Sequence, residues 1–116
     1  MRITENVYQT SGILYGTNSN TYCIDTGEGL VLIDAGFSEK QYEIMRTRRK
    51  EDGLGNKKIR DLFITHGHFD HAGNGWLLQK DGAKVYMSAE DGAAVKSGDE
   101  RTLSDLFGRK FRAFTP

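Results

Sequence analysis

All three histidines of the chain fall within one six-residue window, residues 66–71, which reads His-Gly-His-Phe-Asp-His. The window follows an aliphatic segment with strand character, residues 59–65, and precedes a segment with helical character, residues 72–80. On extended backbone, side chains at positions i and i+2 point the same way, so His66 and His68 can reach one point together. The chain then turns, and Asp70 and His71 project to a second point nearby. The window therefore predicts a strand–loop–helix unit with its polar side chains at the end of the strand.

The remaining pattern predicts alternating strands and helices. A continuous aliphatic run at 30–33 indicates a buried strand, and the glycine-containing segment 26–29 before it indicates a hairpin turn. Ser38 is expected to cap a helix that ends near Asp52. We expect strands at 2–10, 20–25, 30–33, 59–65 and 84–87, and helices at 38–52, at 72–80, after a capping box at 88–91, and from 102 onward. This order predicts an α/β fold in which helices pack on a mixed sheet.

Composition limits the class of protein and its partners. The chain has 116 residues, enough for a single domain spanning 1–116, and its 16 basic residues equal its 16 acidic ones, so no bulk charge favours nucleic acid or a membrane surface. The start has no secretory apolar segment, and the longest aliphatic run, 30–33, is too short to cross a bilayer. Cys23 is the single cysteine, so no intrachain disulfide forms. We expect a cytoplasmic protein without nucleic-acid or membrane partners.

Two further groups of residues are better explained by structure than by function. A basic cluster at 46–50 is flanked on both sides by acidic residues and is expected to be a solvated helix face rather than a phosphate site. Cys23 lies mid-strand and is expected to be a small buried residue. The aromatic residues are expected to pack in the core, the last three of them where further chain would pack: Tyr15, Trp76, Phe107, Phe111 and Phe114.

The 66–71 window carries the ligands of a metal site. Imidazole nitrogen and carboxylate oxygen are the ligands that zinc favours, which makes His66, His68, Asp70 and His71 the candidate metal ligands. Gly67 removes side-chain crowding between the first two. The expected cofactor is Zn²⁺, as one or two ions, with other divalent metals such as Fe or Mn as alternatives.

The segment 65–73 resembles the signature loop of the metallo-β-lactamase superfamily, and the upstream Leu-Ile-Asp-Ala-Gly at 32–36 resembles that family's strand ending in Asp-x-Gly. The resemblance covers essentially the whole chain but only the N-terminal half of a usual family domain. It implies half of an αββα sandwich, with His66 and His68 on a first metal and Asp70 and His71 on a second. Asp34 and Thr65 would support the loop from behind the ligands. Asp34 is equally explained as a turn residue, and Thr65 as a β-branched strand end.

The family pattern continues with a third histidine for the first metal, a bridging carboxylate and a last histidine. No histidine follows His71 in this chain. Each metal would thus receive two ligands, whereas a catalytic zinc usually has three protein ligands and a water. We expect an incomplete domain, whose site is completed by a missing C-terminal half, another copy or another polypeptide.

The resemblance implies a metal-dependent hydrolase in which zinc-activated water attacks a small thioester, ester or lactone carbonyl, with Asp70 orienting the nucleophile. Two alternatives stay open: a catalytically inert, metal-poor fragment or dimerising half-domain, and a phosphodiesterase or nuclease of the same superfamily. Di-iron oxidoreductases related to the family usually carry Glu where His68 stands, which favours zinc and hydrolysis.

Overall fold

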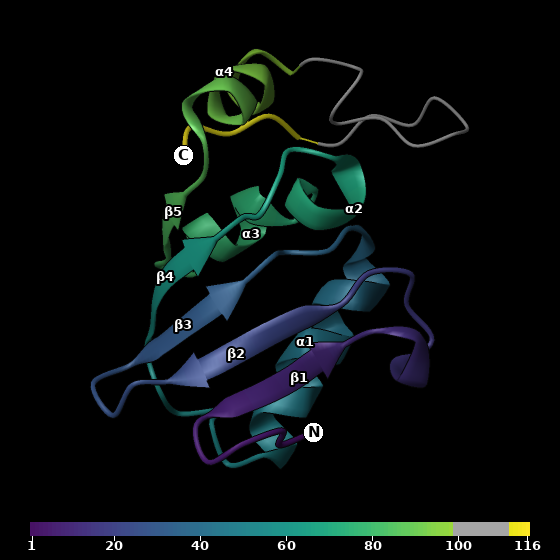
Figure 1. Cartoon of the computed structure of the whole chain (residues 1–116), viewed down its shortest axis with the longest axis vertical. Coiled ribbons are helices and arrows are strands. Elements are labelled where there is room, and N and C mark those ends of the chain that lie inside the picture. Colours follow the sequence, from purple (N-terminus) through teal and green to yellow (C-terminus); the bar gives the residue numbers. More distant parts are fainter. Residues whose placement is uncertain (99–111) are drawn as a thin grey trace.

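The computed structural model describes residues 1–98 and 112–116, and the strands in them form one mixed sheet in the order β1-β2-β3-β4-β5 (Figure 1). β1, β2 and β3 pair antiparallel, whereas β3, β4 and β5 run parallel. The strands are β1 Val7–Ser11, β2 Thr21–Asp25, β3 Leu30–Ile33, β4 Ile59–Phe63 and β5 Lys84–Tyr86. The helices are the 3₁₀ turn η1 Ile13–Tyr15, then α1 Ser38–Glu51, α2 Phe69–Ala72, α3 Gly75–Lys80 and α4 Ala89–Ser97.

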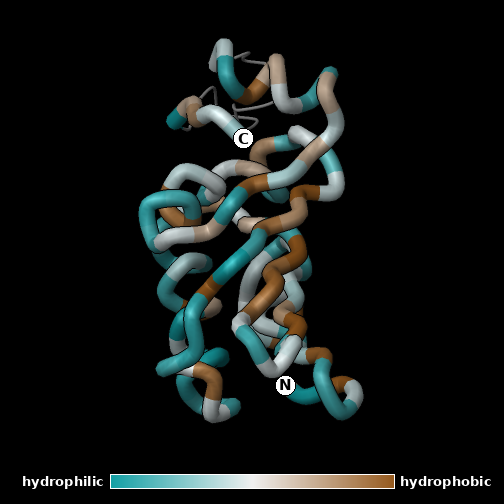
Figure 2. The backbone as a smooth tube through the Cα atoms, turned by 90° about the vertical axis from the view of Figure 1, so that its left-hand side faces the viewer, coloured by the Kyte–Doolittle hydropathy of each residue, from teal (hydrophilic) through white to brown (hydrophobic). Residues whose placement is uncertain are grey.

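One face of the sheet carries the core. Alternate strand residues such as Cys23, Leu32 and Leu62 are buried, because successive side chains of a strand point to opposite faces. Helix α1 lies behind the sheet and α3 beside it on the same side (Figure 1), while hydrophobic stretches follow the strands through the middle of the molecule (Figure 2). The α/β class and the mixed sheet flanked by helices are confirmed. In the described part of the chain, no helix is long and apolar enough to cross a membrane.

The predicted first strand is too long at its beginning. The sequence favoured 2–10, but β1 begins at Val7 and runs to Ser11. The backbone N–H groups of Ile3 and Thr4 both donate to the Val7 carbonyl, so the chain turns back on itself, and Arg2 forms an isolated bridge with Tyr8. Local hydrogen bonding, which alternation in the sequence does not show, ends the strand there.

The predicted helix at 72–80 is wrong as one element, because the chain forms α2 and α3 with a break at Gly73 and Asn74. The Asn74 N–H donates to the Gly36 carbonyl (2.9 Å), and its side-chain amide donates to the Ser38 carbonyl (3.0 Å). A Cβ at Gly73 would lie 2.8 Å from the Cβ of Phe37 and 3.2 Å from the Gly36 carbonyl oxygen. This close approach between the helix break and the turn after β3 diverts the backbone from regular α-helical bonding.

The predicted helix starts at Ser38 and Ser88 are supported by side-chain contacts. Ser38 Oγ accepts from the Gln41 N–H (3.2 Å), and Ser88 Oγ accepts from the Asp91 N–H (3.3 Å). Phe114 packs against α3, where a Cβ at Gly75 would lie 2.3 Å from its ring, so this residue already belongs to the core of the described chain. The helix expected from 102 onward, with Phe107 and Phe111, lies outside the described residues.

Candidate metal centre

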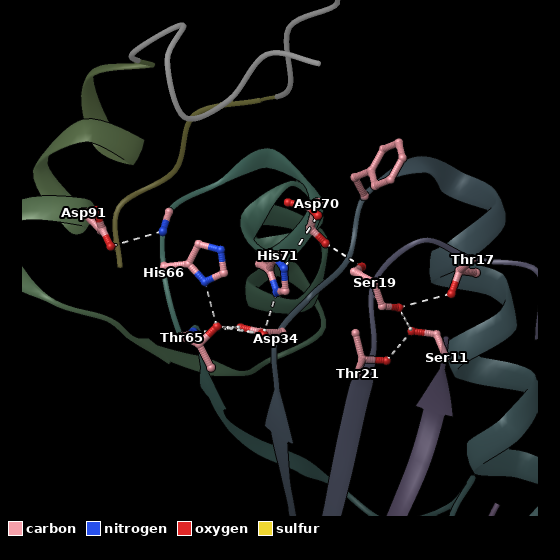
Figure 3. A network of polar contacts seen from close by, with 12 residues as sticks. Ser11, Thr17, Ser19, Thr21, Asp34, Thr65, His66, Asp70, His71 and Asp91 are labelled. Atoms are coloured by element: carbon pink, nitrogen blue, oxygen red, sulfur yellow. Dashed lines mark hydrogen bonds and ion pairs between the residues drawn. The ribbon is translucent and has the colours of Figure 1, made fainter. Parts of the chain in front are cut away.

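The predicted ligands gather where β3 and β4 end: His66 and His68 lie in the loop after β4, and Asp70 and His71 lie in α2. Figure 3 shows His66, Asp70 and His71 there. The ring centroids of His66 and His71 lie 4.2 Å apart, and those of His66 and His68 lie 4.8 Å apart. The Asp70 carboxylate lies 3.6 Å from Nε2 of His71. The structure thus brings together all four side chains that the sequence nominated, from one short loop.

Asp34 supports this loop from the end of the neighbouring strand. Its carboxylate accepts from the Thr65 N–H (2.7 Å) and hydroxyl (2.8 Å), and its Oδ2 lies 2.8 Å from Nδ1 of His71. Asp34 is 5% exposed and has a positive φ of 63°, a backbone conformation that Asp tolerates better than most residues. Asp34 therefore makes the contacts expected of a residue behind the ligands, which a simple turn residue would not make.

The hydrogen bonds of Asp34 and Thr65 determine which ring nitrogen of His71 and of His66 carries the proton. A carboxylate only accepts hydrogen bonds, so in the neutral imidazole of His71 the proton lies on Nδ1 and Nε2 keeps a lone pair. Since the Thr65 hydroxyl donates its proton to Asp34, its oxygen accepts from Nδ1 of His66 at 3.0 Å, and Nε2 of His66 is free as well. Metal-bound histidines characteristically donate their second N–H to such partners.

A buried polar network supports the loop from the opposite side. Ser19 Oγ donates to the Asp70 carbonyl at 2.6 Å (Figure 3). The Gln41 amide of α1 donates to Ser19 Oγ and Ser11 Oγ, both at 3.0 Å, and Ser11 also pairs with Thr21 at 2.6 Å. Sequence reasoning missed this network, because isolated Ser, Thr and Gln residues carry no motif.

Asp91 is a second contact to the loop that sequence reasoning missed. Its Oδ2 accepts from the Gly67 N–H at 3.2 Å (Figure 3). The capping-box pattern identified Asp91 as a residue of a helix start, and its backbone N–H does bond Ser88 Oγ. The direction of its carboxylate depends on how α4 packs, which the local pattern does not contain.

The donor set fits zinc in its chemistry. Imidazole and carboxylate are suitable ligands. In the neutral rings, the hydrogen bonds to Nδ1 leave a lone pair on Nε2 of both His66 and His71, and Nε2 of His71 lies 3.6 Å from the Asp70 carboxylate. Within residues 1–98 and 112–116, however, no three His, Cys, Asp or Glu side chains already surround one point as a metal requires. Side-chain rotation and at least one ligand from outside the described residues would complete a three-ligand site. The ligand roles of His66, His68, Asp70 and His71 stay predictions.

Cys23 and Arg49 are both buried between the sheet and α1. Burial raises the pKa of Cys23 to about 11, so the thiol stays protonated near neutral pH, as expected of a core residue. The prediction that the basic cluster at 46–50 is a solvated face is wrong for Arg49, which is only 6% exposed. Arg49 follows Gln41 and Met45 at i+4 spacing and shares their buried face of α1.

The fold and the loop define a class of structure: a mixed sheet with a histidine-rich loop where its parallel strands β3 and β4 end. The family model described as the metallo-beta-lactamase superfamily matches residues 14–114, and the chain belongs to that superfamily. Its homologues there are hydrolases, and the metallo-β-lactamases among them are metal-dependent.

Three relatives illustrate the match. A probable metallo-hydrolase of Methanocaldococcus jannaschii is 34% identical over 83% of this chain and 45% of its own length. A thioesterase of Emericella nidulans is 36% identical over 67% of this chain and 22% of its own. The native metallo-β-lactamase of Legionella gormanii superposes with a TM-score of 0.79 at 28% identity, over 98% of this chain and 43% of its own. This chain therefore spans less than half the length of each relative.

Proposed function

We propose that this chain provides the metal-binding loop of a hydrolase that cleaves small thioester, ester or lactone substrates by attack of water. The observation that carries the proposal is the convergence of His66, His68, Asp70 and His71 at one sheet edge, with Asp34 bonded behind them. A bound zinc ion would supply a nucleophilic water at neutral pH and polarise the substrate carbonyl.

The chain's own residues would have distinct roles at that site. His66 and His68 would hold one metal through ring nitrogens, and His71 would hold a second together with Asp70. Asp34 would bind Nδ1 of His71 directly and Nδ1 of His66 through Thr65, so that each ring keeps the tautomer with a lone pair on Nε2. Asp70 would bind metal and accept a hydrogen bond from the attacking water, since its carboxylate lies beside His71. Ser19 would keep the Asp70 backbone in place.

Two observations favour a carbonyl substrate over a phosphodiester. A relative is named as a thioesterase and a solved relative as a β-lactamase. The basic cluster is also largely neutralised or buried: Arg46 pairs with Glu43 (3.3 Å), Arg48 pairs with Glu51 (2.9 Å), and Arg49 faces the core. The remaining ligands would come from a C-terminal half or a second copy. The single domain at 1–116 and the cytoplasmic location stay predictions.

The test is bound zinc per chain, measured by elemental analysis after zinc exposure and desalting, with native mass and circular dichroism on the same sample. Near-stoichiometric zinc on the wild-type chain and its loss from the His66→Ala/His68→Ala variant would support the proposal, and a dimeric native mass would indicate that a second copy completes the ligands. Samples that retain zinc would then be assayed for thioester hydrolysis. A well-folded wild-type chain that retains no zinc would show that these residues do not form a working site by themselves.

A further inference from the structure

The first turn of α4 touches the metal loop through one side chain. Ser88 caps the helix by accepting from the Asp91 backbone N–H, so the Asp91 carboxylate is not needed for the cap. Instead its Oδ2 accepts from the N–H of Gly67, 3.2 Å away. Asp91 is half-buried, whereas its neighbour Glu90 is exposed. Figure 3 shows Asp91 and Asp34 meeting the loop from different elements.

The contact from Asp91 reaches the metal loop between two of the candidate ligands. Gly67 is buried and lies between His66 and His68. A Cβ at Gly67 would be 3.2 Å from the Cβ of Asp91, so the loop backbone packs directly on α4. Hydrogen bonds to an ionised acceptor are stronger than neutral ones, and a buried N–H left without an acceptor is costly.

Anchoring the Gly67 N–H restricts the orientation of the peptide that joins His66 to Gly67. The Cα atoms of the two histidines flank this glycine, and glycine has more backbone freedom than any other residue. Asp34 restrains the His66 ring through Thr65 but has no hydrogen bond to His68 or Gly67 among the described residues. The contact from α4 therefore restrains a part of the loop that Asp34 does not hold.

We propose that Asp91 is a positioning residue of the metal loop: by binding the Gly67 N–H, its carboxylate holds His66 and His68 in the relative orientation that lets them share one ion. The proposal rests on the proposed function, because it assigns Asp91 a role at the same site. It makes α4 part of the metal centre although α4 contributes no ligand.

The experiment compares Asp91→Ala with two matched variants of the same helix turn. Glu90→Ala removes an equal charge from an exposed neighbour, and Ser88→Ala removes the cap of α4 without touching the carboxylate. The dissociation constant for zinc is measured by competition with a chelator. We expect Asp91→Ala to weaken zinc binding about tenfold, as for other residues that orient metal ligands, with both controls staying within about twofold of wild type. Asp91→Asn keeps an acceptor oxygen and should restore most of the affinity.

Amide hydrogen exchange of the metal-free proteins provides a readout independent of zinc. The Gly67 N–H should be protected in wild type, Glu90→Ala and Ser88→Ala, and lose its protection in Asp91→Ala. Zinc affinity equal to wild type in Asp91→Ala, or an unprotected Gly67 N–H in wild type, overturns the positioning role. Failure of wild type to bind zinc would instead show that the loop forms no working site in this chain by itself, and the Gly67 exchange rates would still show whether Asp91 holds the loop.

Discussion

At the scale of single residues, Asp34 has the largest expected effect on the metal loop. Asp34→Asn preserves size and tolerates the positive φ of 63°, but it places an amide opposite the N–H and O–H groups that now donate to the carboxylate. We expect zinc affinity to fall by about 10- to 100-fold and the His71 tautomer to shift toward Nε2–H. Chelator competition and ¹⁵N chemical shifts of the imidazole would measure the two effects.

The control for Asp34 is Asp25→Ala, which removes a carboxylate paired with Lys57 at the far end of β2. Equal loss of zinc affinity in both variants would show that only net charge matters, contrary to the role assigned to Asp34.

Burial of the Cys23 thiol makes the free energy of unfolding depend on pH. Its pKa is raised from 9.0 to about 11 by burial, so the folded state keeps the thiol proton at pH values where the unfolded chain loses it. The thiol's contribution is thus complete below pH 9 and is lost as pH rises toward about 11, by about 2–3 kcal/mol. Urea unfolding across this range should show wild type losing stability faster than Cys23→Ala. Parallel pH profiles would contradict this assignment.

At the scale of elements, Gln41 joins α1 to the sheet and, through Ser19, to the metal loop. Its buried amide donates to Ser11 Oγ and Ser19 Oγ and accepts from the Phe37 N–H. Gln41→Leu fills similar volume but removes these three hydrogen bonds of the buried amide, so the free energy of unfolding should fall by about 2–4 kcal/mol. Lys40→Ala, an exposed neighbour, should change it by less than about 0.5 kcal/mol. Urea denaturation would measure the free energy of unfolding of both variants. If Gln41→Leu lost as little stability as Lys40→Ala, water would be replacing the Gln41 hydrogen bonds.

At the scale of the whole molecule, one face of the sheet has no helix over it in the described part of the chain. Ile33, Phe63 and Tyr86 are neighbours there, in register across β3, β4 and β5. The Phe63 and Tyr86 rings stack at 4.8 Å and are 45% and 37% exposed. An apolar row of this kind favours association with a second protein surface.

We expect the isolated chain to self-associate through this face as its concentration rises, and Phe63→Thr/Tyr86→Thr to remain monomeric. The matched control is Ile13→Thr/Leu14→Thr, which removes two more exposed apolar side chains outside the sheet and should leave association unchanged. Sedimentation equilibrium over a range of concentrations would measure the mass of each. A wild-type chain that is monomeric throughout would argue that the face requires a different partner.

Several features could be predicted from the sequence because they depend on residues close together in the chain. The aliphatic run at 30–33 is β3 as predicted, and Ser38 and Ser88 make the expected cap contacts within one turn. The candidate ligands lie together because all four come from six consecutive residues, which run from the loop after β4 into α2.

Only the tertiary structure decided which distant groups meet this loop. Asp34 reaches His71 across 37 positions, Asp91 reaches Gly67 across 24, and Ser19 reaches Asp70 across 51. The helix break at Asn74 and the burial of Arg49 likewise arise from packing against segments far along the chain. Periodicity and spacing record the geometry of a few neighbouring residues, whereas these contacts depend on how strands and helices pack in three dimensions.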